Sequence, residues 1–343
     1  MIHQQDYENV KIFAGNSHPE LAKKVCTYLG LPLGELYIDY FSNTETRIKL
    51  EESVRGKDIY FIQTGCAGKD SNGNQLHVND HVVETLLFMD TCKRSGCNSI
   101  TLLMPCYPYA RQDKKDSPRA SISSSLLARL YEECGLTRIV CVELHAACIQ
   151  GFFDVCADNL YTTDTIVEKL IQDILIGEDF GDNYKDNVVV ISPDEGGFKR
   201  AQIVANKLDV PFLAMSKRRD YSQKNKVEES ILLGDQSQLQ NKTAIVVDDM
   251  LDTGGTVIKT VDVLKQFGAR DVIVAVTHGI LSGPAIDRIN GSASLRSVLI
   301  SDSLPTTEHQ QRSNKIHVFS ISELLSKVIQ RLIKGKSISE IFK

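Results

Sequence analysis

The stretch "AIVVDDMLDTGGTVIKT", residues 244–260, decides the fold that we expect for this chain. Residues 243–249, "TAIVVDD", predict a buried strand, residues 256–268, "TVIKTVDVLKQFG", predict a helix, and "MLDTGGT" is the turn between them. Backbone amides at the start of a helix attract phosphate, and Gly254 and Gly255 let a ligand approach without a Cβ in the way. The stretch therefore predicts a strand-turn-helix unit with an anion site in its turn.

Carboxylates beside this turn need an explanation, because Asp248, Asp249 and Asp252 would repel a bound phosphate. Two like charges about 4 Å apart repel by roughly 4 kcal/mol at an effective dielectric constant near 20. Asp248 and Asp249, at the end of the strand, can accept hydrogen bonds from sugar hydroxyls or face a metal ion. The alternative is structural, with Asp252 or Thr253 as a helix cap and the acidic pair as a solvated strand end. The Gly-Gly-Thr that follows the acidic pair favours the phosphate and sugar site.

The rest of the chain repeats this alternation of short apolar runs and helical stretches. Runs rich in Val and Ile, with ten or more residues of helical periodicity between them, predict crossover connections around parallel sheets. We expect an α/β fold with two related halves, joined by the polar stretch 176–187. The polar stretches 66–77 and 217–226 predict exposed loops, and 217–226 is a candidate active-site flap. The runs are "VKIFAG", "DIYFIQ", "SITLLMP", "RIVCVEL", "NVVVISPD", "TAIVVDD", "DVIVAVTHG" and "KIHVFSI".

The composition is that of a globular protein, and 343 residues are enough for two ordinary domains. A formal net charge of −5 argues against broad binding to nucleic acid or to a membrane surface. The nine cysteines are scattered, without CxxC or zinc-type spacing, which predicts reduced thiols. The sequence has neither a secretory-signal pattern nor a run of about 18 apolar residues. We expect a cytoplasmic protein with no nucleic-acid or membrane partner.

The turn at residues 252–256 resembles the ribose-5-phosphate loop shared by phosphoribosyltransferases and phosphoribosyl diphosphate (PRPP) synthetases. Other segments resemble the synthetases in particular, namely their ATP-gripping segment, their adenine-binding turn and their metal-binding histidine segment. These segments are, in that order, "PCYPYARQDKKDSPRASIS" (105–123), "FSNTE" (41–45) and "ELHAACIQGFFD" (143–154), and "SPDEGGFKRA" (192–201) and "THGILSGPA" (277–285) also match. Because the resemblance covers nearly the whole chain, the sequence is identified as a member of the class I ribose-phosphate diphosphokinases.

The resemblance implies an α/β fold of two related phosphoribosyltransferase-like domains, each a mainly parallel sheet flanked by helices. Residues 8–160 are expected to form the N-terminal domain, which carries the ATP-binding segments. Residues 161–343 are expected to form the C-terminal domain, which carries the ribose-5-phosphate loop and the catalytic flap, with a tail that packs back on the first domain. The family further implies a homo-oligomer, with dimers assembled into a hexamer.

The ATP site is predicted from residue chemistry and from the resemblance together. Arg111 and Gln112 follow a Pro-Tyr turn, and the guanidinium is a planar bidentate donor suited to a phosphate or a purine. A solvated charge run is the alternative for this segment. The resemblance implies that Phe41 packs on the adenine and that two polar side chains bind the adenine edge. The implied ATP-binding residues are Phe41, Asn43, Glu45, Arg111, Gln112 and His145.

The resemblance also implies a metal site, a sugar site and a catalytic pair. His145 and Asp194 each follow a strand, where such residues are usually structural, but they match ligands of a Mg²⁺ bound to the ATP phosphates. Magnesium keeps several waters, so two protein ligands are adequate. Lys217 and Arg219 match the catalytic pair, and a closing flap can neutralise the transferred diphosphate and exclude water. The implied ribose-5-phosphate-binding residues are Asp194, Asp248, Asp249, Asp252, Thr253, Gly254, Gly255 and Thr256.

The sequence departs from the family pattern at positions that concern the metal and regulation. Glu143 stands where the family usually has Asp, which places a longer acid near the metal. Ala147 replaces a serine, and Ser117 replaces a lysine, in the region that binds inhibitory ADP or phosphate in regulated relatives. Inhibition by ADP and activation by phosphate are expected, at a strength that these changes leave open. The residues that still match the allosteric site are Arg119, Gln150, Asp158, Ser337 and Ser339.

The implied reaction transfers the diphosphate group of MgATP to O1 of ribose-5-phosphate, giving PRPP and AMP for nucleotide biosynthesis. A phosphoribosyltransferase would use the same loop to consume PRPP, but it does not account for the ATP-like segments before residue 160. The other alternative is a catalytically silent regulatory homologue that associates with active subunits. Such a homologue is expected to lose the loop or the lysine of the flap, and this sequence retains both.

Overall fold

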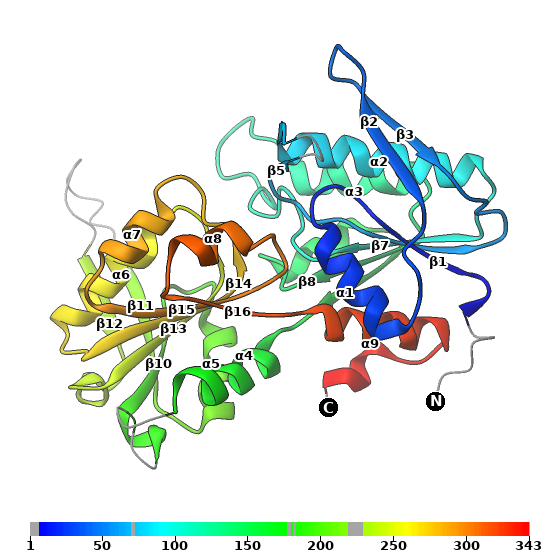
Figure 1. Ribbon diagram of the computed structural model, residues 1–343. Coiled ribbons are helices and arrows are strands. Elements are labelled where there is room, and N and C mark those ends of the chain that lie inside the picture. The colour runs from blue at the N-terminus through cyan, green and yellow to red at the C-terminus, as the bar shows by residue number, and fades with distance from the viewer. Residues whose placement is uncertain (1–6, 70–72, 177–179, 181–182, 219–228, 343) are drawn as a thin grey trace. The chain divides into compact units, whose positions relative to one another are not determined.

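The structure, a computed structural model, describes residues 7–69, 73–176, 180, 183–218 and 229–342. The chain folds into two compact units, each of which is described separately (Figure 1). The first unit comprises Met1–Tyr161, Ser303–Pro305 and Ser320–Lys343, and the second comprises Thr162–Asp302 and Thr306–Phe319. The C-terminal segment therefore belongs to the same unit as the N-terminal segment.

The first unit is built on a five-stranded parallel sheet in the order β1-β4-β7-β8-β9. Its strands are β1 (Val10–Ala14), β4 (Asp58–Ile62), β7 (Ser99–Met104), β8 (Arg138–Val142) and β9 (Cys156–Leu160). Two small antiparallel pairs accompany the sheet, namely β2 (Leu36–Tyr40) with β3 (Thr46–Leu50), and β5 (Gly68–Lys69) with β6 (Gln75–Leu76). The second pair lies in the stretch 66–77 that was predicted as a loop, of which residues 70–72 lie outside the described part.

Helices cover this sheet and close its core. They are α1 (Pro19–Leu29), α2 (Val78–Arg94), α3 (Ser123–Glu133) and α9 (Ser322–Ile333), with short 3₁₀ helices at Ala147–Phe152 and Ile338–Phe342. Phe88 of α2 is fully buried, and its ring stacks on that of Phe61 with centroids 3.9 Å apart. In α9, the Ser326 hydroxyl donates to the Val25 carbonyl of α1 at 3.3 Å. The contact between α1 and α9 thus joins the N-terminal and C-terminal parts of the chain in one unit.

The second unit is built on a seven-stranded sheet in the order β12-β11-β10-β13-β14-β15-β16. Neighbouring strands are parallel, except that β12 runs antiparallel to β11. The strands are β10 (Val188–Ser192), β11 (Phe212–Arg218), β12 (Glu229–Leu233), β13 (Thr243–Leu251), β14 (Asp271–Gly279), β15 (Leu295–Ser301) and β16 (Ile316–Phe319).

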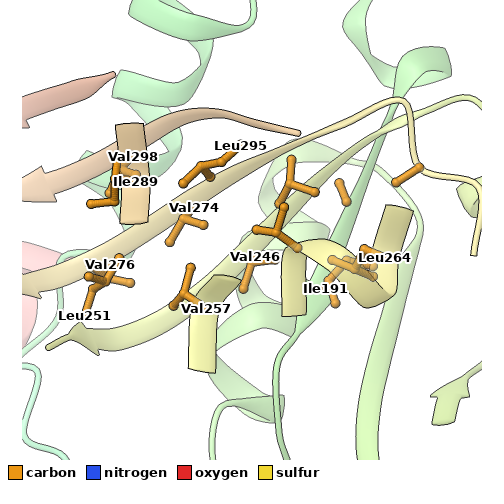
Figure 2. Packing of buried hydrophobic residues seen from close by; sticks show 14 of the residues in the cluster. Ile191, Val246, Leu251, Val257, Leu264, Val274, Val276, Ile289, Leu295 and Val298 are labelled. Atoms are coloured by element: carbon orange, nitrogen blue, oxygen red, sulfur yellow. The ribbon is translucent and has the colours of Figure 1, made fainter. Parts of the chain in front are cut away.

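The helices of the second unit pack on this sheet through apolar side chains. They are α4 (Thr163–Lys169), which continues as a π-helix (Leu170–Ile174), α5 (Phe198–Leu208), α6 (Gly255–Gln266), α7 (Ala285–Gly291) and α8 (Thr307–Arg312), with 3₁₀ turns at Tyr184–Asn187 and Gln236–Leu239. Figure 2 shows Val257 and Leu264 of α6 and Ile289 of α7 in one buried cluster with strand residues such as Val246 and Val274. This packing fixes α6 and α7 against the end of β13.

The predicted α/β architecture, two mainly parallel sheets flanked by helices, is confirmed. The prediction that residues 176–187 link the two halves is wrong, because the elements on both sides of this stretch belong to the second unit. Phe180 is fully buried, and the guanidinium groups of Arg270 and Arg296 lie 5.5 and 4.9 Å from its ring centroid. Within the described residues, no helix is long and apolar enough to cross a membrane.

Candidate active site

In the second unit, the predicted acids gather at the carboxyl end of the parallel sheet. Asp248 and Asp249 lie near the end of β13, and Asp194 lies two residues beyond the neighbouring strand β10. Ligands of open α/β sheets bind at this edge, outside the carboxyl ends of the strands. The backbone N–H of Gly197 donates to Asp194 Oδ1 at 2.9 Å, and the Asp194 side chain is exposed. The strand order thus brings three predicted residues to one edge.

The electrostatics of Asp248 show how closely these carboxylates are placed. Burial first, and then the neighbouring carboxylates of Asp249 and Asp194, together raise the pKa of Asp248 to about 8. The Asp249 backbone N–H donates to Asp248 Oδ1 at 2.9 Å. Nη1 of Arg200, on α5, lies 3.6 Å from the same oxygen, and the two side chains are 15% and 23% exposed. A half-buried acid that faces other acids and one guanidinium is suited to accept hydroxyl hydrogen bonds.

The predicted turn between β13 and the following helix is present, with a glycine in the left-handed conformation. Gly254 has φ 75°, in the left-handed region, and its carbonyl accepts from the Ile258 N–H at 2.9 Å in the first turn of α6. A Cβ at Gly254 would lie 3.6 Å from the Cα of Ala285, at the start of α7. Thr253 and Thr256 are exposed on either side of the two glycines. The helix start, between two exposed threonines, is a place where backbone amides can bind an anion.

The predicted catalytic flap is only partly within the described residues. Lys217 lies in β11, and its Cα pairs with that of Ser230 in β12, so the flap joins two antiparallel strands. Arg219, with most of the stretch 217–226, lies outside the described residues. The structure therefore describes only the two strands that bound the predicted flap.

In the first unit, the "FSNTE" segment forms the turn of the β2–β3 hairpin. The Phe41 N–H donates to the Glu45 carbonyl at 2.9 Å, and the Glu45 N–H donates to Asn43 Oδ1 at 3.3 Å. Phe41 is 52% exposed, and the guanidinium carbon of Arg47 lies 5.9 Å from its ring centroid. An exposed aromatic ring beside a polar turn is a platform on which a base can stack. The structure therefore brings the three predicted adenine-binding residues together.

Arg111 and Gln112 are both exposed in the segment that follows β7. The Gln112 N–H donates to the Tyr109 carbonyl at 2.9 Å, and Tyr109 has φ 59°. The Gln112 side-chain oxygen accepts from the Ser123 hydroxyl at the start of α3. These bonds form a tight turn, and both side chains lie exposed on the surface of the first unit.

His145 is exposed three residues beyond the end of β8. Glu143, expected as a longer acid near the metal, is only 3% exposed and has φ 46°. The Leu144 N–H donates to Asn159 Oδ1 at 2.9 Å, which ties the segment to β9. The substitution for Asp at residue 143 therefore places a buried carboxylate next to an exposed imidazole. In the described part of the chain, no group of three or more His, Cys, Asp and Glu side chains could hold a metal ion.

The residues predicted for an allosteric site lie in the first unit. Asp158 forms an ion pair with Arg138 of the neighbouring strand β8, and Gln150 donates to the Ala147 carbonyl within its own turn at 3.1 Å. The Ser337 and Ser339 hydroxyls lie 2.7 Å apart. Arg119 is exposed, with φ 66°. The serines and Arg119 are accessible, whereas Asp158 already has a cationic partner.

Two arginines of the second unit were not predicted from the sequence. Arg200 faces Asp248, and Nη1 of Arg288 donates to the Thr253 carbonyl of the glycine turn at 2.7 Å. Arg200 lies within the matched segment "SPDEGGFKRA", and Arg288 comes three residues after "THGILSGPA". Their place in or near these segments was the available signal, but only the folded chain shows what they contact.

Comparisons with known proteins show the family of this chain. The family model for the N-terminal domain of ribose phosphate pyrophosphokinase matches residues 10–135, and that for the phosphoribosyl transferase domain matches residues 158–290. The chain is 41% identical over 334 residues to ribose-phosphate pyrophosphokinase 2 of Schizosaccharomyces pombe, covering 97% of each chain. It is also similar to the crystal structure of phosphoribosylpyrophosphate synthetase from Mycobacterium smegmatis, with a TM-score of 0.82 and 35% identity, over 96% of this chain and 100% of that one.

Proposed function

The chain belongs to the ribose-phosphate pyrophosphokinase family. From that premise we propose which of its residues bind each substrate and which act in catalysis. It is a transferase that moves the diphosphate group of ATP to O1 of ribose-5-phosphate, giving PRPP and AMP for nucleotide biosynthesis. ATP and ribose-5-phosphate are therefore its substrates. The assignment of residues to each substrate is the proposal.

Ribose-5-phosphate binds at the carboxyl edge of the second sheet. Its 5-phosphate accepts hydrogen bonds from the backbone amides of residues 252–256, where Gly254 keeps the turn open. Asp248 and Asp249 accept hydrogen bonds from the ribose hydroxyls, and Asp194 faces the diphosphate end of the site. The observation that carries this assignment is the left-handed glycine turn directly after two adjoining carboxylates.

ATP binds to the first unit through its base and its phosphates. The exposed ring of Phe41 stacks on the adenine, and Asn43 and Glu45 bind the adenine edge. Arg111 and Gln112 contact the nucleotide with the donors that their exposed side chains offer. His145 lies on the phosphate side of the nucleotide.

Magnesium is the proposed cofactor, held by His145 and Asp194. Both side chains are exposed, and Asp194 Oδ1 accepts a single backbone bond, so the carboxylate can bind a cation that keeps most of its waters. Bound Mg²⁺ would neutralise charge on the ATP phosphates. These residues fit magnesium better than a metal that demands four protein ligands.

Lys217 and Arg219 are the proposed catalytic residues. When the flap closes, their positive charges stabilise the diphosphate as the sugar O1 attacks the β-phosphorus in line and AMP leaves. The chain's residues act mainly by positioning the substrates, by neutralising charge and by excluding water.

The test uses the full chain with ribose-5-phosphate, ATP and Mg²⁺, and follows AMP and PRPP by chromatography. Lys217→Ala should lower kcat by on the order of 10²–10³ while ribose-5-phosphate binding is kept. Lys207→Ala is the matched control, because Lys207, on α5, forms an exposed ion pair with Asp164 of α4. Equal loss of binding and turnover would contradict the role of Lys217. A folded protein that binds both substrates but forms no AMP would be the silent homologue.

The domain limits 8–160 and 161–343, with a C-terminal tail that packs back on the first domain, remain part of the proposal, as does the regulatory site, comprising Arg119, Gln150, Asp158, Ser337 and Ser339. So do cytoplasmic location, the absence of nucleic-acid and membrane partners, and assembly of dimers into a hexamer. Exposed apolar side chains on α2 and α3, namely Val83, Leu87, Leu126 and Leu130, support contact between subunits. Sedimentation velocity distinguishes a hexamer from a dimer or a monomer.

A further inference from the structure

We propose that Arg288 binds the 5-phosphate of ribose-5-phosphate and so helps the enzyme select a phosphorylated sugar. Arg288 lies on α7, outside the glycine turn to which the phosphate was assigned. The inference rests on the proposed function, because it takes residues 252–256 as the phosphate site. It adds a charged side chain to a site that otherwise consists of neutral backbone amides.

The guanidinium of Arg288 lies directly on the glycine turn. Its Nη1 donates to the Thr253 carbonyl at 2.7 Å and lies 3.3 Å from the place that a Cβ at Gly255 would occupy. Glycine at residue 255 therefore leaves room for the guanidinium as well as for a ligand. The contact joins residues 35 positions apart in the chain, so it is a feature of the fold.

Most donors of Arg288 are available for a ligand. A guanidinium has five N–H groups in a planar fork, which matches the oxygens of a phosphate. The side chain is exposed, and among the residues that the structure describes its only side-chain hydrogen bond is to Thr253. The adjacent Asp287 forms an ion pair with Arg312 of α8 at 3.5 Å, so its carboxylate neutralises Arg312 and not Arg288.

Helix α7 holds Arg288 in this place. Its first residue, Ala285, is buried, and the Ala285 Cα lies 3.6 Å from the Cβ position of Gly254. Residues three apart lie on the same face of a helix, so the face that packs on the turn also carries Arg288. Ile286 and Ile289 anchor α7 in the core. The guanidinium is thus presented to the turn by a fixed helix.

The charge of Arg288 matters because three acids adjoin the turn in the sequence. Asp248, Asp249 and Asp252 all lie within five residues of Thr253. A phosphate dianion that binds beside them needs a compensating cation, and bidentate Arg–phosphate bonds are among the strong, charge-assisted hydrogen bonds. A sugar without a phosphate would gain nothing from Arg288.

The alternative is that Arg288 only clamps the turn through the Thr253 carbonyl. Two variants separate the roles. Arg288→Gln keeps a donor for that carbonyl but removes the charge, and Arg288→Lys keeps the charge but removes the planar fork. We expect Arg288→Gln to raise the KM for ribose-5-phosphate by on the order of tenfold to a hundredfold, with the KM for MgATP within twofold of the wild type. Arg288→Lys should recover much of that loss.

The assay is steady-state PRPP formation by the full chain at several NaCl concentrations. The KM for ribose-5-phosphate should rise with salt in the wild type and rise less steeply in Arg288→Gln, because a screened charge has been removed. Arg312→Gln is the matched control, since Arg312 is an exposed arginine paired with Asp287, and it should leave the KM unchanged.

An unchanged KM in Arg288→Gln, or an equal rise for both substrates, overturns the proposal. A KM for ribose-5-phosphate that rises in Arg288→Lys but not in Arg288→Gln would show a clamp alone, which also overturns it. Thr256→Val tests the turn itself. If Thr256→Val raises the KM and Arg288→Gln does not, only this inference fails, whereas no effect from either variant would refute the phosphate assignment of residues 252–256.

Discussion

Removing the carboxyl group of Glu84 should destabilise the first unit by an amount that its hydrogen bonds allow us to work out. Glu84 lies on α2 and is fully buried. Its Oε1 accepts from the Asn16 N–H at 2.8 Å and from Gln63 Nε2 at 2.7 Å. Glu84→Ala leaves the buried Gln63 amide and the half-buried Asn16 N–H without an acceptor, and each such donor costs about 1–3 kcal/mol. We expect the free energy of unfolding to fall by about 2–6 kcal/mol.

Glu84→Gln is the matched variant, because it keeps an oxygen for the two donors. Glu84 Oε2 lies 3.9 Å from Nδ1 of His81, and within the described residues neither atom has a hydrogen-bond partner. An amide nitrogen placed at that oxygen can donate to the imidazole. We expect Glu84→Gln to change the free energy of unfolding by less than about 1 kcal/mol.

The measurement is urea denaturation, with hydrogen exchange of the α2 amides as a readout that belongs to the first unit alone. Activity supplies a second readout, because Asn16 Nδ2 donates to the Tyr40 hydroxyl at 3.3 Å, next to Phe41. Glu84→Ala should therefore raise the KM for ATP, whereas Glu84→Gln should not. Equal losses of stability in both variants would refute the hydrogen-bond reasoning and assign the effect to the lost charge.

Three further predictions concern the sites themselves. Asp248→Asn should raise the melting temperature at pH 8, because burial and Asp249 raise the pKa of the Asp248 carboxyl to about 8 and so penalise its charged form in the folded state. The penalty grows as the pH rises from about 4 towards 8, so melting curves of variant and wild type should converge near pH 4, and a difference independent of pH would contradict this cause. Gly254→Val places a branched side chain at φ 75°, with strain of about 1–2 kcal/mol, and should raise the KM for ribose-5-phosphate in kinetic assays but not that for ATP. Phe41→Ala removes a half-exposed ring, so calorimetry should show a stability change below about 0.5 kcal/mol while the KM for ATP rises; an unchanged KM would exclude adenine stacking.

Signals carried by neighbouring residues were enough to predict the architecture and the glycine turn. The apolar run of β13 and the helical pattern of α6 are properties of consecutive residues, and so is the need for glycine where φ is 75°. The hairpin turn around Phe41 was likewise contained in five adjacent residues. Such features are predictable because the interactions that form them span only a few positions.

Other features depend on which strands and helices become neighbours, and only the tertiary structure decided them. The stretch 176–187 looks like a linker by composition, but Phe180 is buried within the second unit. Glu143 looks like a metal-site acid, but its segment turns it into the interior. Arg200 contacts Asp248 and Arg288 contacts Thr253 from helices that are distant in sequence, because sheet order places β10, β13 and β14 side by side. Spacing along the chain cannot encode these contacts, since packing between elements, not local propensity, brings the side chains together.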